Sequence, residues 1–171
     1  MASRILDFYR LEKPDSEGRM LEEYWRWGQD QTEQCHDFIQ WMFPLEAPSA
    51  VNPDAPLLTE EDEAAFRQEP LLRSSLRRSL GFFLNFLGLA ISPDGRVDRN
   101  EKFHERIALW RTANHNWLRI TRVLKSLRLL GCEDEARAVW KCLRNLHEED
   151  GYVSENSFSY WREAAEGFDP K

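Results

Sequence analysis

The chain has 171 residues and a formal net charge of −7, a length that lets one domain build a core without disulfide or metal support. The negative charge disfavours sequence-independent binding to DNA or RNA, which depends on neutralising phosphates, although a local basic patch could override it. Seven Trp, ten Phe and four Tyr predict a core rich in aromatic side chains.

The N-terminal part is predicted to hold an arm and two helices. The arm, residues 1–18, contains a short apolar and aromatic segment. A short helix is expected over residues 19–28. Asp30 and Glu33 are spaced for reciprocal capping, so a second helix is predicted over residues 31–42, which a proline soon follows.

A proline-rich loop is expected over residues 44–58. Thr59, followed by four acidic residues, predicts a helix start, because its side chain can cap the first turn and acids there suit the helix dipole. This helix should end near Gln68. A longer helix is predicted over residues 70–89, with small residues every seventh position opposite its apolar face (Ser74, Gly81, Gly88). That stripe indicates close approach by another helix, with a bound ligand as the alternative.

The C-terminal part is predicted to be a loop followed by four helices. Residues 92–100 have turn composition without the spacing of a calcium-binding EF-hand loop. Helices are expected over residues 102–111 and 133–147, and from Ser154 to Gly167. The strongest helix signal is Asn116–Leu130, because Asn114 or Asn116 can cap its start and Gly131 can end it in a left-handed conformation.

The helix Asn116–Leu130 carries two stripes of side chains. One broad apolar face should point into the core (Trp117, Ile120, Val123, Leu124, Leu127, Leu130). Behind it lies a second stripe with apolar ends and two central cations (Leu118, Arg122, Lys125, Leu129). A helix that is apolar on two sides should be covered on two sides. We therefore predict an all-α fold: one domain, residues 1–171, of about seven helices around this central helix, with no convincing strand pattern.

No motif for metal, cofactor or catalysis is found in the sequence. The histidines lack the spacing of a metal set, and three cysteines form neither a CxxC pair nor an even disulfide set (His36, His104, His115, His147; Cys35, Cys132, Cys142). No GxSxG, HExxH or phosphate-binding glycine loop occurs. We expect no cofactor, no metal and no enzyme activity, with an enzyme of unrecognised class as an alternative. Lacking a signal-peptide core and any apolar run of about 20 residues, the protein should be soluble, cytoplasmic and reduced.

Two stretches resemble the opioid growth factor receptor family: DFIQWMFPLEAP (Asp37–Pro48) and NWLRITRVLKSLRLLG (Asn116–Gly131). They are similar to the two signature segments of that family's conserved domain, and weaker resemblance extends from about Phe8 to about Trp140. In animals, the family's receptor is associated with the nucleus, binds the opioid growth factor Met-enkephalin and restrains cell proliferation. The resemblance implies a non-catalytic binding domain for a peptide or protein segment. We expect a stand-alone version of the domain, with nuclear association if the source is a eukaryote.

The predicted binding surface consists of Arg122 and Lys125, helped by Arg119 and His115, beside the tryptophan-rich helix over residues 31–42. Arginine, lysine and aromatic rings suit a peptide carboxylate, a phosphate or an acidic segment. The alternative is that Arg122 and Lys125 form internal ion pairs with the abundant acids. A small anionic ligand or nucleic acid at these cations is the second candidate for the partner.

Gln40 and Trp41 complete the predicted binding residues, since both lie in the first resembling segment. The competing interpretation is that Trp41 belongs to the core and that Gln40 fixes a backbone group.

Overall fold

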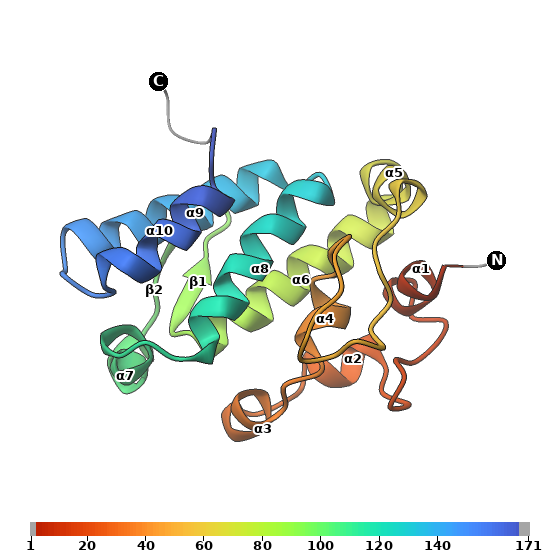
Figure 1. Ribbon diagram of the computed structural model, residues 1–171, viewed down its shortest axis with the longest axis horizontal. Helices are drawn as coiled ribbons and strands as arrows, with labels where there is room; N and C mark the ends of the chain where they lie inside the picture. Colours follow the sequence, from red (N-terminus) through yellow and green to blue (C-terminus); the bar gives the residue numbers. More distant parts are fainter. Residues whose placement is uncertain (1–2, 168–171) are drawn as a thin grey trace. The chain divides into compact units, whose positions relative to one another are not determined.

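The computed structural model describes residues 3–167, and it is mostly helical (Figure 1). The chain forms two compact units. The first unit runs up to Phe82 and includes Leu129–Gly131, and the second unit comprises Phe83–Arg128 and the residues from Cys132 onward. None of the helices among residues 3–167 is long and apolar enough to cross a lipid bilayer.

The first unit is built from short helices that enclose aromatic rings. Its elements are α1 (Arg4–Tyr9), α2 (Leu21–Tyr24), α3 (Gln29–Gln34), α4 (Ile39–Met42), α5 (Glu60–Gln68) and most of α6 (Pro70–Phe86). Tyr9 of α1 meets Phe66 of α5 edge-on, with ring centroids 4.9 Å apart. The rings of Phe8 and Trp41 lie 5.2 Å apart, and all four side chains are buried. The predicted aromatic core is therefore present in this unit.

The prediction of one helix over residues 31–42 is wrong, because the chain is extended between α3 and α4. Cys35 has φ −83° and ψ 125°, and Gly28 rather than Asp30 precedes α3 as its N-cap. The Cys35 thiol donates to the Asp37 carboxylate, which also accepts from Arg19. These side-chain bonds hold the chain away from the helical conformation that local propensity favours.

The predicted start of α5 is confirmed, with Thr59 as its N-cap, and the structure adds a reciprocal bond from Asp62. The Thr59 hydroxyl accepts from the Asp62 backbone N–H at 3.2 Å, and the Asp62 carboxylate accepts from the Thr59 backbone N–H at 3.1 Å. This reciprocal pair satisfies two backbone donors that a helix start leaves without partners.

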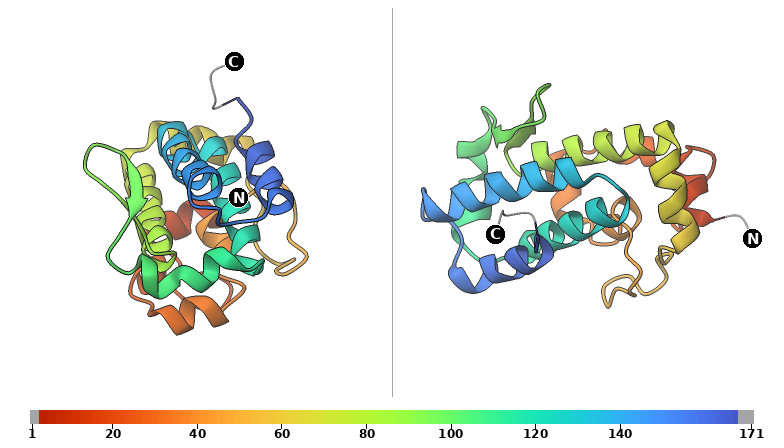
Figure 2. Two further views of the ribbon diagram at one scale, coloured as in Figure 1. Left: turned by 90° about the vertical axis from the view of Figure 1, so that its left-hand side faces the viewer. Right: turned by 90° about the horizontal axis from the view of Figure 1, so that it is seen from above.

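The second unit combines a hairpin with the longer helices. Its elements are β1 (Leu89–Ile91), β2 (Val97–Arg99), the 3₁₀ turn η1 (Phe103–Arg106), α7 (Ile107–Arg111), α8 (His115–Leu129), α9 (Glu133–Glu148) and α10 (Glu155–Ala164). The last residue of α8, Leu129, belongs to the first unit. The strands are antiparallel, with Ala90 opposite Asp98. β2 packs against α9, and α10 lies beside α9 (Figure 2).

The hairpin corrects the prediction of a purely helical fold. Residues 92–100 were expected to form a loop, but β2 lies within them and pairs with β1. Strands of three residues are too short to show a convincing alternation of apolar and polar side chains. The described residues hold ten α-helices rather than about seven, mainly because the N-terminal segments divide into short helices.

A chain of buried tryptophans forms the core of the second unit. Trp110 and Trp117 each meet the ring of Trp161 edge-on, at centroid distances of 6.5 and 6.0 Å. The indole N–H of Trp161 donates to the Trp117 carbonyl at 3.0 Å, and that of Trp110 donates to the Leu87 carbonyl at 3.1 Å. Each large apolar ring is therefore buried with its polar atom satisfied.

The two predicted stripes of α8 have different environments. The broad apolar face is buried, with none of its six predicted members more than 6% exposed. Gly131 ends the helix with φ +75°, as predicted. On the second stripe, however, Leu118 is 72% exposed and Lys125 is exposed. The expectation that this stripe is covered is thus wrong at both positions.

Of the two glycines in the small-residue stripe, the predicted close approach is found at Gly88 but not at Gly81, where no heavy atom lies within 4 Å of an added Cβ atom. A Cβ atom at Gly88 would lie 2.8 Å from the Phe103 Cα atom and 3.2 Å from the Arg106 Cβ atom. Gly88 also has φ +81°, a conformation that side-chain-bearing residues rarely adopt. The neighbour is η1 of the same unit, so the chain itself explains this glycine.

Candidate functional site

The four predicted binding residues of α8 differ in exposure. Lys125 is exposed, His115 and Arg122 are half-buried, and Arg119 is only 5% exposed. The Arg119 guanidinium donates to the Asn116 side-chain oxygen at 3.0 Å, so this cation is directed along its own helix. Arg122 and Lys125 are therefore the cations of this group that a partner can reach most directly.

Arg122 and Lys125 share a surface with an exposed apolar side chain. Leu118, Arg122 and Lys125 are spaced i, i+4 and i+7 and hence lie on one side of α8. We call these three residues the α8 strip. Burial lowers the pKa of the Arg122 guanidinium, which still remains charged at neutral pH because the ordinary value for arginine is above about 12. A carboxylate that reached Arg122 would meet a partly desolvated cation, where charge-assisted hydrogen bonds are strong.

Gln40 and Trp41 lie on α4 in the first unit, and both are buried, at 5% and 1% exposure. In the amide orientation that satisfies both ends of Gln40, its nitrogen donates to the carbonyls of Asp37 and His36 at 3.1 and 3.3 Å, and its oxygen accepts from Ser49 at 3.2 Å. Gln40 thus fixes backbone groups. The Trp41 ring packs on Phe8, and the Arg4 guanidinium lies 4.9 Å from its centroid.

The structure therefore divides the six predicted binding residues between the two units. Gln40 and Trp41 belong to the first unit, and the four residues of α8 belong to the second. Gln40 and Trp41 are buried and make contacts typical of core residues. The α8 strip is the part of the predicted surface that is both charged and accessible to a partner.

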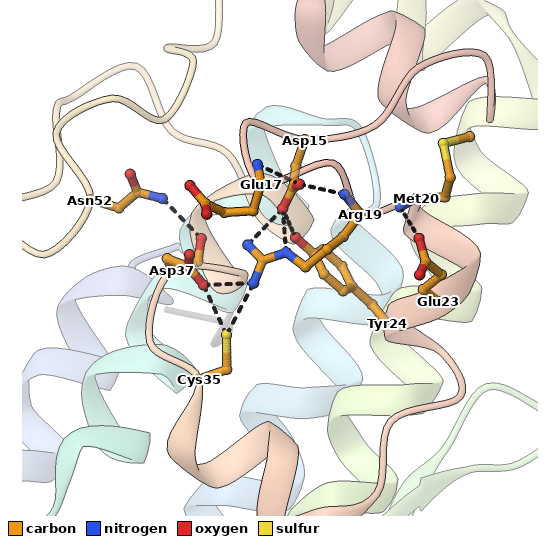
Figure 3. Close-up of polar contacts among 9 residues, drawn as sticks. All are labelled: Asp15, Glu17, Arg19, Met20, Glu23, Tyr24, Cys35, Asp37 and Asn52. Atoms are coloured by element: carbon orange, nitrogen blue, oxygen red, sulfur yellow. Dashed lines mark hydrogen bonds and ion pairs between the residues drawn. The ribbon is translucent and has the colours of Figure 1, made fainter.

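A polar cluster in the first unit was not predicted from the sequence (Figure 3). The buried Asp15 carboxylate accepts from the backbone N–H groups of Glu17 and Arg19, at 2.9 and 2.8 Å. It also accepts from the Arg19 side chain at 2.8 Å and from the Tyr24 hydroxyl. Burial and this bond to Asp15 raise the pKa of Tyr24, so its hydroxyl stays protonated.

Arg19 links that buried carboxylate to the segment between α3 and α4. Its guanidinium donates to the Asp37 carboxylate at 3.1 Å and to the Cys35 sulfur at 3.4 Å. Burial would lower the pKa of Arg19, but hydrogen bonds to Asp37 and Asp15 outweigh burial and raise it. The charged side chains of the cluster pair with one another and join three segments of the first unit, which indicates a structural role.

A cavity in the second unit was also missed. It has a volume of about 330 Å³ and is lined by Asp98 and Arg99 of β2, by three residues of α9 and by the residue that follows this helix (Cys142, Asn145, Leu146; Glu149). No sequence pattern indicated it, because β2 was not predicted and the cavity requires β2 beside α9.

Comparison with known proteins identifies the relatives of the chain. The family described as "Opioid growth factor receptor (OGFr) conserved region" matches residues 4–164, nearly the whole described chain. The chain belongs to the opioid growth factor receptor family. The opioid growth factor receptor of Mus musculus is 37% identical over 136 residues, which cover 75% of this chain and 21% of the relative. No solved structure gives a significant match.

Opioid growth factor receptor-like protein 1 of Mus musculus is 35% identical over 153 residues, covering 84% of this chain and 31% of the relative. The Homo sapiens opioid growth factor receptor is 35% identical over 134 residues, covering 75% of this chain and 20% of the relative. This family member thus spans between a fifth and a third of these relatives' lengths. Relatives named as receptors support a receptor-like binding domain and fit the prediction of a non-enzyme.

Proposed function

We propose that this opioid growth factor receptor family member is a non-catalytic domain that binds a peptide or protein segment through the α8 strip. The observation that carries the proposal is the strip itself: Leu118 is 72% exposed, and two cations follow it on the same side of the helix. Covering a leucine side chain stabilises a complex by up to about 1.5–3 kcal/mol. A segment that presents an apolar side chain and then a carboxylate complements this strip.

The family resemblance suggests the first ligand to test, Met-enkephalin. Binding is followed by intrinsic tryptophan fluorescence, because the buried Trp117 directly precedes Leu118 of the strip on α8. A scrambled peptide of the same composition is the control. Saturable binding of the true sequence alone, with weak dependence on salt, supports the proposal. No saturable change at millimolar peptide overturns enkephalin as the ligand.

Charge reversal locates the site. Lys125→Glu changes an exposed side chain, so the melting temperature should stay close to that of the wild type while the peptide affinity falls about tenfold or more, which corresponds to about 1.4 kcal/mol. Lys141→Glu is the matched control, because Lys141 is exposed on α9 and lies outside the strip. Arg122→Glu should abolish binding without unfolding. Unfolding of Arg122→Glu together with unchanged binding by Lys125→Glu would instead assign Arg122 to an internal ion pair.

One further variant, Leu118→Ser, tests the competing partner class. A small anionic ligand or nucleic acid would need only the cations, so its affinity should fall steeply with salt and should be unaffected by Leu118→Ser. A peptide should lose affinity in Leu118→Ser. This substitution exchanges an exposed side chain and leaves the buried face of α8 unchanged.

A further inference from the structure

The cavity between β2 and α9 in the second unit has a neutral floor and a charged rim. Cys142 and Leu146 are 6% and 1% exposed, one helical turn apart on α9, and form its deep part. Asp98 and Glu149 line it from opposite elements and are exposed. A volume of about 330 Å³ lies at the lower end of the range typical of small-molecule sites, about 300–1,000 Å³.

The positive charge at the cavity is already engaged. The Arg99 guanidinium forms an ion pair with Asp150 and lies 4.8 Å from the centroid of the Phe103 ring. By contrast, within residues 3–167 the carboxylates of Asp98 and Glu149 have no hydrogen bond or ion pair. Two carboxylates thus remain available at the rim, and they favour a cation.

The buried residues of the cavity indicate which uncharged group a ligand would carry. Burial raises the pKa of the Cys142 thiol to about 12, so the sulfur is neutral at physiological pH and contributes no charge. The thiol is more than nine-tenths buried, lines the cavity and makes no hydrogen bond to another described residue. A neutral thiol beside Leu146 suits an aliphatic group, since free cysteine packs as a small apolar residue.

We propose that this cavity binds an alkylammonium group, with its aliphatic part over Cys142 and Leu146 and its ammonium between Asp98 and Glu149. Asn145, which also lines the cavity, can accept a further ammonium hydrogen through its amide oxygen. Such a group is found in a small free amine and at the amino terminus of a peptide. The proposal does not depend on the α8 strip, because the two sites share no residue.

The test uses protonated n-butylamine with the isotope-labelled chain, followed by NMR chemical shifts. A ligand this small should bind with a Kd on the order of millimolar, and titration therefore extends to about 100 mM. Saturable shifts are expected in β2 and in the C-terminal half of α9. n-Butanol tests the need for charge: equal binding of the alcohol would overturn the proposal, as would the absence of saturable shifts.

Charge-neutralising variants identify the carboxylates. Asp98→Asn combined with Glu149→Gln should weaken n-butylamine binding about tenfold or more, which corresponds to about 1.4 kcal/mol. Glu101→Gln combined with Glu163→Gln removes the same net charge from exposed positions outside the cavity and should leave the affinity unchanged. Equal weakening in both pairs would show that the overall negative charge attracts the amine, and the proposed site would be rejected.

A second arm distinguishes the two sources of the ammonium. The dipeptide Leu-Gly and its N-acetylated form are titrated under the same conditions. Tighter binding of the free dipeptide than of n-butylamine, lost on acetylation and in Asp98→Asn with Glu149→Gln, would identify a peptide amino terminus. Binding of n-butylamine alone would identify a free amine. Both results support the cation site, and neither depends on enkephalin binding by the α8 strip.

Discussion

Replacing Gly88 by alanine should destabilise the protein, whereas the same replacement at Gly81 should not. Gly88 follows α6 with φ +81°, and an added Cβ would lie 2.8 Å from the Phe103 Cα atom. The left-handed conformation costs a residue with a side chain about 1–2 kcal/mol. The clash is with backbone, which cannot rotate away, and overpacking of this kind costs about 1–3 kcal/mol. The expected loss is therefore about 2–5 kcal/mol.

Gly81 provides the control, because it lies within α6, shortly before Gly88, and has open space around it. No heavy atom lies within 4 Å of a Cβ placed at Gly81, and its φ is not positive. Alanine in a helix interior is more stable than glycine by about 0.5–1 kcal/mol. Gly81→Ala should therefore raise the free energy of unfolding slightly, while Gly88→Ala lowers it.

Urea unfolding measures both variants, with circular dichroism for the helices and fluorescence for the tryptophans. In a protein of this size a change of 1 kcal/mol shifts the melting temperature by about 2–4 °C, so Gly88→Ala should melt at least several degrees below the wild type. A Gly88→Ala variant within about 0.5 kcal/mol of the wild type would refute the argument, since surface substitutions commonly fall in that range. Equal destabilisation by Gly81→Ala would also refute it.

Three further predictions follow from local contacts. Partial burial would raise the pKa of Asp37, but hydrogen bonds from Arg19 and Cys35 outweigh burial and lower this pKa. The stability that Asp37 contributes is therefore present above the ordinary carboxyl pKa of about 4, and it is lost as the pH falls through the lowered value. Melting temperatures between pH 6 and pH 2.5 should consequently fall less in Asp37→Asn than in the wild type, and parallel curves would contradict this. Thr59→Ala should cost about 1 kcal/mol in urea unfolding, whereas Ser154→Ala should cost less, because Ser154 precedes α10 without a capping hydrogen bond from its side chain; equal losses would contradict the difference. With a pKa of about 12, Cys142 should react negligibly with iodoacetamide at pH 8, because only about 10⁻⁴ of such a thiol is ionised there. It should become reactive in urea. Mass spectrometry of the native chain should show no early modification at Cys142.

Features that depend on neighbouring residues in the chain could be predicted from the sequence. The start of α5 needs only Thr59 and an acid three residues later, and the end of α8 needs only Gly131. The buried face of α8 follows from helical periodicity. In each case the physical cause acts within one or two turns, so the sequence contains it.

Features that depend on distant residues could not be predicted in this way. The chain leaves the helical conformation at Cys35 where Arg19, 16 residues earlier, contributes hydrogen bonds to Cys35 and Asp37. The hairpin depends on cross-strand pairing, and its strands of three residues carry little pattern of their own. The cavity needs both β2 and α9, so its carboxylates, some fifty residues apart in the sequence, gave no common signal.

The candidate binding residues show why helical spacing is an incomplete guide to a site. Spacing correctly places Arg119, Arg122 and Lys125 on α8, but it specifies an angle around the helix and not a depth. Arg119 is buried and donates to Asn116, whereas Lys125 is exposed. Leaving an exposed cation without a ligand costs little free energy, whereas a buried cation must be bonded within the protein. Depth therefore separates a residue that holds the helix in place from one that can meet a partner, and only the folded chain supplies that depth.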